Sequence, residues 1–324
     1  MTDLKIAENL YKSFEAWLDI KAEQDQQKEL DPDRLGKLRG GSCGFLDTKG
    51  KIYGTCPRKA LARSWGFNAR PDDDKRLMFE QGKSNEGFWD EIWTMMFGED
   101  AGIPEGHKDS VISWTTPDGR VVEGSPDYIL KKFLDVDKVL LEYKRISSVW
   151  TARKVSIKKF PKKDHIIQAG HYMGVSQLDN GVIIYKQDVD FPCPSIGKAD
   201  TTALWPVTSP IVEYDGDYPR RVMGHVSMFD LLWEGGSLWF RHHTETDWRQ
   251  STLTMQGIHD YYWITSRQEK EKFLANKPAR TSPVGDTGDS FSACDFCELK
   301  DICKDKGLSY DAFENQVKEL IPKS

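Results

Sequence analysis

The chain has 324 residues, enough to bury a sizeable core, and we expect one elaborated domain rather than two large ones. Its formal net charge is -6 at pH 7, so any contact with nucleic acid must depend on a local basic patch. We find no signal peptide and no apolar run long enough to span a bilayer, so we expect a soluble cytoplasmic protein of a bacterial, archaeal or phage-infected cell that makes no membrane contact.

Apolar residues at helical spacing predict an accessory helical segment within residues 1–40. The main domain is expected over 41–310, and 311–324 is expected to form a helical tail. Within the main domain, Pro57 suits the first turn of a helix that begins after Cys56. A further helix is expected over about 77–97, and another over about 252–276.

Two β-rich runs, at 121–130 and 138–146, predict a hairpin. Glu142 and Lys144 lie two apart in the second run, so their side chains share one face of a strand. Asp127 in the first run can converge on them. Two carboxylates and an amine suit metal-assisted hydrolysis of a phosphodiester, although solvated charges on a surface hairpin can show the same spacing.

The segment that follows is strongly basic, with eight Lys or Arg and no Asp or Glu between Lys144 and Lys163. It is either a solvated loop or a groove that tracks phosphates, with an aromatic side chain available to stack on a base. The candidate DNA-binding residues are Arg145, Trp150, Arg153, Lys154, Lys158, Lys159, Lys162 and Lys163.

Asp164 can cap a helix over 165–173, which is followed by a strand over 181–187. Gln168 and Tyr172 lie four apart and therefore project from one face of that helix. Such a pair is by itself typical of an ordinary helix surface. The predicted order in the middle of the chain is helix, three strands, helix, strand.

Several of these motifs together resemble the PD-(D/E)XK nuclease superfamily over about residues 50–305. Pro126-Asp127 and Glu142-x-Lys144 resemble its signature, and Gln168-x-x-x-Tyr172 resembles a motif of RecB-like nucleases and the related CRISPR-associated exonucleases. The resemblance implies an α/β fold with a restriction-endonuclease-like core, in which helices flank a mixed central sheet. Those families usually carry a metal-binding His four residues after a helical Gly, where this chain has Glu86. Glu86 is either a replacement ligand for a hard cation or an ordinary exposed helix glutamate.

The resemblance implies a Mg2+- or Mn2+-dependent deoxyribonuclease, an exonuclease acting on single-stranded DNA or DNA ends. Asp127 and Glu142 would hold the metal, Glu86 would be a further ligand, Lys144 would assist the water, and Gln168 and Tyr172 would orient the substrate. The alternative is a catalytically silent DNA-binding or assembly subunit. Expected partners are DNA and proteins of recombination, replication or CRISPR adaptation. The sequence does not decide between a monomer and a homo-oligomer.

Cys294, Cys297 and Cys303 supply three thiolates at C-x2-C-x5-C spacing, one fewer than a tetrahedral zinc or a cubane cluster needs. Iron-sulfur nucleases of the CRISPR-associated, AddB and eukaryotic Dna-two types bracket the nuclease core with one upstream cysteine and three downstream. That resemblance implies a [4Fe-4S] cluster on these three cysteines and Cys56. Structural zinc stays an alternative, and Cys43 is the other candidate for the first position.

Overall fold

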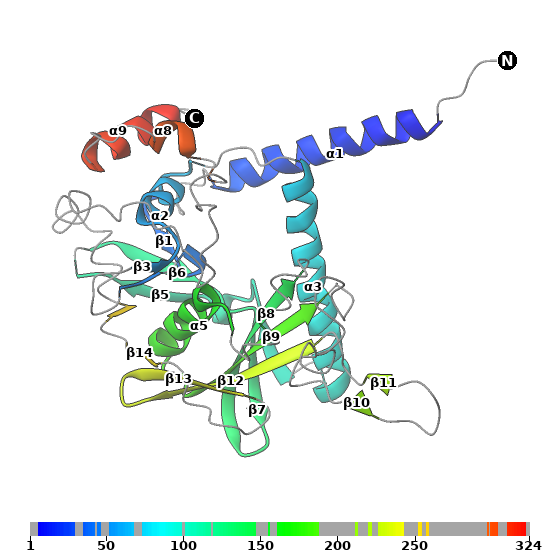
Figure 1. Cartoon of the computed structure of the whole chain (residues 1–324), viewed down its shortest axis with the longest axis vertical. Helices are drawn as coiled ribbons and strands as arrows, with labels where there is room; N and C mark the ends of the chain where they lie inside the picture. The colour runs from blue at the N-terminus through cyan, green and yellow to red at the C-terminus, as the bar shows by residue number, and fades with distance from the viewer. Residues whose placement is uncertain are drawn as a thin grey trace, which may run out of the picture.

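The computed structural model describes residues 6–29, 35–42, 44–46, 52–67, 73–98, 101–117, 119–146, 155, 161–187, 211–212, 220–221, 226–242, 252–254, 257–258, 297, 299–303 and 310–321. A seven-stranded sheet of order β14-β13-β12-β9-β8-β7-β4 forms the centre of this mixed α/β fold (Figure 1). Its strands are β4 (Gly102–Pro104), β7 (Tyr128–Phe133), β8 (Val136–Ile146), β9 (Asn180–Gln187), β12 (Val226–Glu234), β13 (Ser237–His242) and β14 (Thr252–Thr254).

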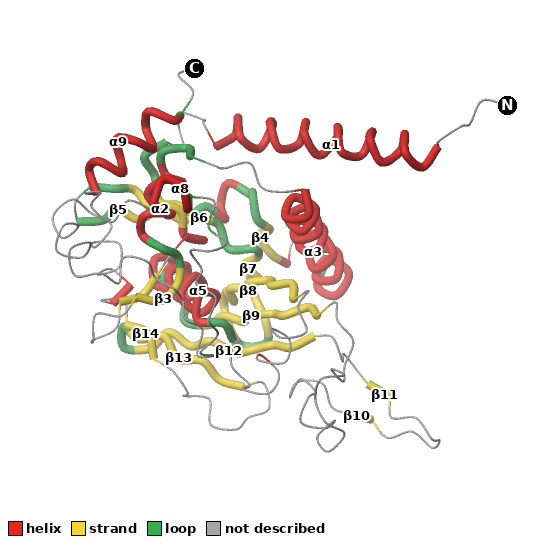
Figure 2. Tube along the Cα trace, turned by 45° about the horizontal axis from the view of Figure 1, so that its top comes forward, coloured by secondary structure: helices red, strands yellow, loops and turns green. Residues whose placement is uncertain are grey.

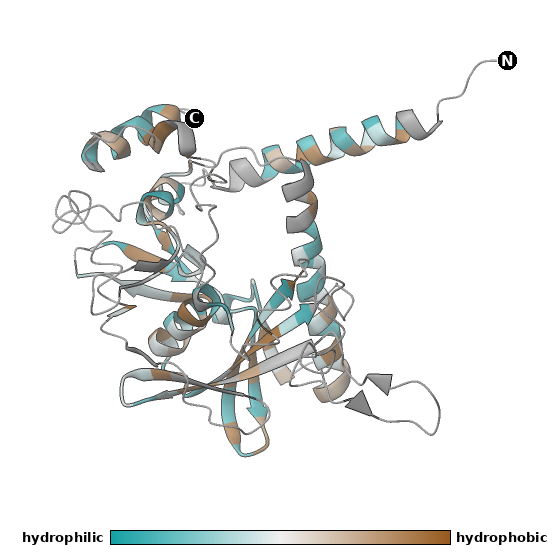
Figure 3. Cartoon of the chain, viewed as in Figure 1, coloured by the Kyte–Doolittle hydropathy of each residue, from teal (hydrophilic) through white to brown (hydrophobic). Residues whose placement is uncertain are grey.

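Within this sheet β8 and β9 are parallel, and the other neighbouring strands are antiparallel. Helix α5 (Lys163–Ser176) connects β8 to β9, as a parallel pair requires. Alternate residues of β8 point to opposite layers of the fold. Leu141 packs with Trp89 and Trp93 of α3 (Asp73–Phe97), whereas Leu140 packs with the α5 side. The sheet is therefore buried on both faces, and hydrophobic segments lie in its central strands and along α5 (Figure 3).

A smaller sheet of order β1-β6-β5 lies on the other side of α5 from the seven-stranded sheet. It comprises β1 (Leu38–Arg39), β5 (Ile112–Thr115) and β6 (Val121–Gly124), and the short helix η1 (Gly40–Ser42) follows β1. The Tyr172 ring of α5 lies in a slot between Gly40 and Gly124. A Cβ atom on Gly124 would lie 2.6 Å from the ring, and one on Gly40 would overlap it. Because both positions are glycines, α5 can approach this sheet closely.

The remaining described elements lie around these sheets, and the helix after Cys56 packs against the C-terminal helix. Leu61 of α2 (Pro57–Ser64) packs with Leu299 and with Phe313 of α9 (Tyr310–Leu320). Figure 2 shows α2 beside α8 (Lys300–Cys303) and α9, and α1 (Ile6–Glu29) extending away from the sheets. The other short strands are β2 (Gly44–Leu46), β3 (Ile52–Gly54), β10 (Ile211–Val212) and β11 (Arg220–Arg221). Among the described residues, no helix combines the length and apolar character needed to cross a membrane.

Several predicted elements are confirmed, namely the N-terminal helix, the helix after Cys56, the helix ending at Phe97, the helix with Gln168 and Tyr172, the strand ending at Gln187 and the C-terminal helix. The first hairpin run was predicted wrongly as one strand. Its first half is β6 in the small sheet and its second half is β7 in the large one, because Pro126 cannot donate to a ladder and the chain crosses between the sheets there.

Two further expectations were wrong. Lys162 is the N-cap of α5, and Asp164 instead lies in the first turn, where a negative charge favours the helix dipole. Thr252–Thr254 forms edge strand β14 rather than the start of a helix, because Leu238 and its neighbours on β13 offer an unpaired strand edge. Most of the remaining predicted helix lies outside the described residues.

The Tyr172 slot predicts a large difference between two adjacent glycines. We expect Gly40→Ala to destabilise the protein by about 1–3 kcal/mol, the usual cost of overpacking, because its Cβ overlaps the Tyr172 ring. Gly41→Ala is the matched control, since its Cβ would lie 3.6 Å from Gln168 Nε2, an ordinary contact. Urea unfolding measures the free energy of unfolding of both variants. Equal stabilities would contradict the close packing of the Tyr172 ring against Gly40.

Candidate active site

Asp127 ends the crossing from the small sheet to the large one, next to the middle of β8. The main-chain N–H of Tyr143 donates to Asp127 Oδ2 over 2.5 Å, which attaches the crossing to β8. The Asp127 side chain is 11% exposed. One carboxylate oxygen is thus held by the backbone, in a position fixed by the strand rather than by a flexible loop.

Glu142 and Lys144 lie on the same face of β8, as their spacing predicted. Lys144 Nζ donates to Glu142 Oε1 over 2.5 Å and lies 3.9 Å from Asp127 Oδ2. The Glu142 side chain is 0% exposed, and its Oε2 atom has no hydrogen-bond partner among the described residues. The structure therefore brings the three residues together and leaves one buried carboxylate oxygen unsatisfied, which is costly without a further positive or donating group.

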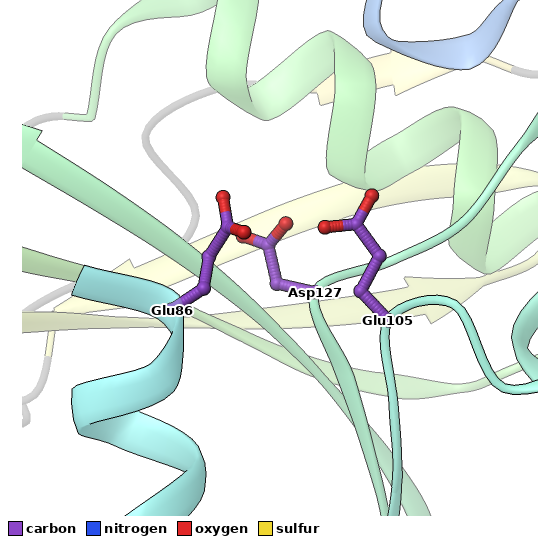
Figure 4. A group of neighbouring side chains, drawn as sticks. All are labelled: Glu86, Glu105 and Asp127. Carbon is purple, nitrogen blue, oxygen red and sulfur yellow. The ribbon is translucent and has the colours of Figure 1, made fainter. Parts of the chain in front are cut away.

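Glu86 and Glu105 complete an acidic cluster with Asp127 (Figure 4). One carboxylate oxygen from each of the three lies within 4.8 Å of the others. Glu86 comes from α3 and is half-buried, whereas Glu105 follows β4 and is exposed. The Glu105 N–H donates to the Asp127 carbonyl over 3.0 Å, which continues the β4–β7 pairing by one residue. Three separate elements thus direct oxygen ligands to one point.

Sequence reasoning missed Glu105. Its context, Pro104-Glu105-Gly106, predicts only a turn, and β4 is too short to show an alternating pattern. The signal that could have found it is the position of this turn at the end of a strand that pairs with the Asp127 strand. Asp90, one turn after Glu86 on α3, was also missed; burial, with Asp127 second, raises its pKa to about 6.

The acidic groups of the site repel one another in a partly desolvated space. Burial, and next the Asp127 charge, raise the pKa of Glu86 to about 7 and that of Glu142 to about 8. Burial likewise raises the pKa of Glu105 and, against the opposing Lys144 charge, that of Asp127. Burial disfavours the Lys144 ammonium, but Glu142 and Asp127 outweigh it and raise the pKa of Lys144, which stays charged. A bound cation would relieve this repulsion.

The Q-x-x-x-Y pair lies on the side of α5 that faces the small sheet. Tyr172 is buried in the core, where Gln168 Nε2 donates to its hydroxyl over 3.4 Å. Gln168 itself is half-buried, and exposed Gly41 is its neighbour. The structure thus separates the two residues by role: Tyr172 packs, and Gln168 retains some solvent contact.

The candidate DNA-binding residues are only partly described. Arg145 lies on the α3 side of β8, where its Nη1 donates to Gln81 Oε1 over 2.7 Å. Lys162 lies at the start of α5, 3.5 Å from the Asp164 carboxylate. The others lie outside the described residues or have side chains that are not described, namely Trp150, Arg153, Lys154, Lys158, Lys159 and Lys163.

Three of the four cysteines proposed as cluster ligands are described, and each is half-buried: Cys56, Cys297 and Cys303. Cys56 is the N-cap of α2, and Arg58 on that helix donates to Cys303 Sγ over 3.1 Å. Cys297 and Cys303 pack at the edge of the cluster that joins α2 to α9. The structure thus brings the start of α2 beside Cys303, although Cys294 and Cys43 lie outside the described residues.

No protein-family model and no curated protein matches this chain. Among solved structures, the crystal structure of SSO0001 shares 14% identity at a TM-score of 0.35, covering 54% of this chain and 73% of that one. The alkaline exonuclease LHK-Exo from Laribacter hongkongensis shares 20% identity at a TM-score of 0.33, covering 50% and 74%. Its complex with dAMP shares 16% identity with the same TM-score and coverage. Similarity at this level carries no argument, so the function must be inferred from the residues of the site.

The raised carboxyl pKa values predict that stability falls with pH when no metal is present. The native state keeps protons on Glu86 and Glu142 that the unfolded chain, with carboxyl pKa values near about 4.3, has released. The stability they contribute is therefore complete in acid and is lost as pH rises through about 7 and 8. We expect the Tm in EDTA to fall between about pH 7 and 8.5, a window above the ordinary pKa of histidine, so that His165 is mostly neutral in the folded and unfolded states.

Glu86→Gln removes one of the two glutamates with a raised pKa, so the fall in Tm should be smaller in this variant. For the wild-type protein at pH 8.5, excess Mg2+ should raise the Tm above its value in EDTA. Thermal unfolding in both buffers is the measurement. A Tm that rises over this interval, or that does not respond to Mg2+, would contradict the description of the site.

Proposed function

We propose that this chain is a Mg2+- or Mn2+-dependent DNA nuclease that hydrolyses phosphodiester bonds, acting as an exonuclease on single strands or DNA ends. The observation that carries the proposal is the acidic cluster of Glu86, Glu105 and Asp127 next to the buried Glu142–Lys144 pair. An acidic cluster alone occurs on many surfaces. Here the neighbouring Glu142 adds a buried oxygen that has no hydrogen-bond partner among the described residues, as a metal ligand would.

The donor set fits a hard divalent cation. Carboxylate oxygens are the ligands that Mg2+ and Mn2+ prefer, and we propose that Glu86, Glu105, Asp127 and Glu142 hold the ion. Such an ion supplies Lewis-acid activation of the phosphodiester and of water. The half-buried cluster excludes part of the solvent, and the hydrogen bond from Tyr143 fixes the orientation of Asp127 before substrate arrives.

Lys144 has two roles in this proposal. Its hydrogen bond to Glu142 Oε1 leaves Oε2 of the same carboxylate for the ion, and its charge lies 3.9 Å from Asp127 where it can stabilise negative charge on the phosphate. Gln168, half-buried beside Gly41, orients the substrate strand. Tyr172 supports it by fixing α5 against the small sheet.

We further propose that Cys56, Cys294, Cys297 and Cys303 bind a [4Fe-4S] cluster with a structural role. The contact of Arg58 with Cys303 supports it, because it places a residue of the Cys56 helix at the sulfur of a residue 245 positions away. Thiolates are ligands that both the cluster and zinc accept. Closing so long a loop would remove much entropy from the unfolded chain.

The nuclease proposal is tested with end-labelled single-stranded and duplex DNA and Mg2+ or Mn2+. We expect metal-dependent cleavage, which Asp127→Asn should reduce about 100-fold or more, the effect of losing a group that acts directly in the chemistry. Asp135→Asn is the matched control, because Asp135 lies exposed in the β7–β8 turn at the other end of the strands. Asp127→Asn that cleaves at the wild-type rate would refute the assignment, and wild-type protein that binds DNA without cleaving it would favour the assembly subunit.

The cluster proposal is tested with anaerobically purified protein. We expect a brown preparation with visible charge-transfer absorption, and we expect Cys294→Ala to lose the colour and to unfold at lower temperature, because the link between Cys56 and the C-terminal cysteines is lost. Cys193→Ala, outside the proposed ligand set, serves as the control. A colourless wild-type preparation that contains zinc would refute the iron-sulfur cluster and show that the cysteines bind zinc instead.

A further inference from the structure

Two cations lie side by side at the carboxyl ends of the parallel strands, on the side that faces α3. Arg145 of β8 is paired in register with Lys186 of β9. Each follows by two residues a side chain that packs in the α3 layer, Tyr143 on β8 and Ile184 on β9, so both cations point to that layer. Because neighbouring strands are about 4.8 Å apart, the two cationic side chains leave the sheet side by side.

Helix α3 holds both cations. Gln81 Oε1 accepts the hydrogen bond from Arg145 over 2.7 Å, and Lys186 Nζ lies 5.2 Å from the centroid of the Phe88 ring. Gln81 and Phe88 lie seven residues apart, two helical turns, and therefore on one face of α3. The cations are thus arranged along a helix face rather than scattered over a surface.

The same helix face carries two unusual side chains. Phe88 is 43% exposed, so a large part of its ring is open to solvent. Asn85, one turn earlier, is only 5% exposed, and its Oδ1 has no hydrogen-bond partner among the described residues. An exposed aromatic ring next to cations is what a binding surface for a single-stranded nucleic acid uses.

This surface lies on other sides of the two elements that carry the proposed nuclease site. Phe88 is two residues from Glu86 on α3, and Arg145 directly follows Lys144 on β8, so the members of each pair project from different sides of their element. A polynucleotide with one phosphate at the acidic cluster must therefore pass around α3 or the carboxyl ends of β8 and β9 to reach it.

We propose that Arg145, Lys186 and Phe88 bind the single-stranded part of the DNA substrate, an inference that rests on the proposed nuclease function. The two cations contact phosphates of the strand, and the Phe88 ring stacks on a base. A duplex keeps its base faces covered by neighbouring bases, so the stacking contact selects an unpaired strand. The surface thus makes a single-stranded end the substrate that this site prefers.

The test is binding of a fluorescent oligothymidine and of a blunt duplex to the full chain in EDTA, where no cleavage takes place. We expect wild-type protein to prefer the single strand and Phe88→Ala to weaken that binding about tenfold, the effect of losing a stacked base. Phe88→Trp should restore it. Lys186→Gln should lower the slope of log affinity against log salt by about 0.7, the loss of one phosphate contact on a single strand.

Matched controls lie at the opposite end of the sheet. Phe133 is 42% exposed and Lys132 is exposed, so Phe133→Ala and Lys132→Gln remove the same groups elsewhere and should leave binding unchanged. Thermal unfolding verifies that each variant is folded. The inference is overturned if wild-type protein does not bind oligothymidine, if it binds the duplex as well as the single strand, or if Phe88→Ala binds like Phe133→Ala.

The failure of this inference is separate from the failure of the proposed function. Binding in EDTA needs no catalysis, so a loss specific to Phe88 and Lys186 would show the strand surface even in a chain that does not cleave. Conversely, metal-dependent cleavage lost in Asp127→Asn, with normal binding by Phe88→Ala, would retain the nuclease and reject the strand surface.

Discussion

The hydrogen bond from the Tyr143 N–H to the Asp127 carboxylate is the interaction on which the site depends. It attaches the segment that crosses from the small sheet to the large one to the middle of β8. From that point the Asp127 carbonyl accepts the N–H of Glu105, which continues the pairing of β4, and the Asp127 carboxylate lies beside Lys144. Strand pairing alone thus places three acids, Glu105, Asp127 and Glu142, together with a lysine, and only Glu86 needs a helix to bring it there.

The site is arranged at a cost to stability. Four carboxylates share a poorly solvated region with one lysine, and burial first, then their mutual repulsion, raises the pKa values of Glu86, Glu105 and Glu142. The stability that the protonated groups contribute is lost as pH rises through the raised pKa values, unless a cation joins the site. Destabilised arrangements of charge are typical of functional sites, where stability is given up for a ligand or a reaction.

Helix α5 relates this site to the rest of the molecule. One side of it covers the face of the large sheet on which Glu142 and Lys144 lie, and the other side inserts Tyr172 between Gly40 and Gly124. Gly124 is only three residues before Asp127, so the contact that joins α5 to the small sheet also limits where the crossing can begin. Elsewhere in the fold, α2 packs with the C-terminal helices α8 and α9, and Arg58 lies against Cys303.

The local features of this protein follow from its sequence. Spacing of two put Glu142 and Lys144 on one strand face, spacing of four put Gln168 and Tyr172 on one helix face, and apolar periodicity located the main helices, because these relations depend only on the geometry of one element. Three features depend instead on the folded structure: Glu105 joins Glu86 and Asp127, the first hairpin run divides between two sheets, and Lys186 lies beside Arg145. Each of these depends on which strands pair, and pairing between distant segments is decided by the burial of both sheet faces as a whole, which no short pattern in the sequence records.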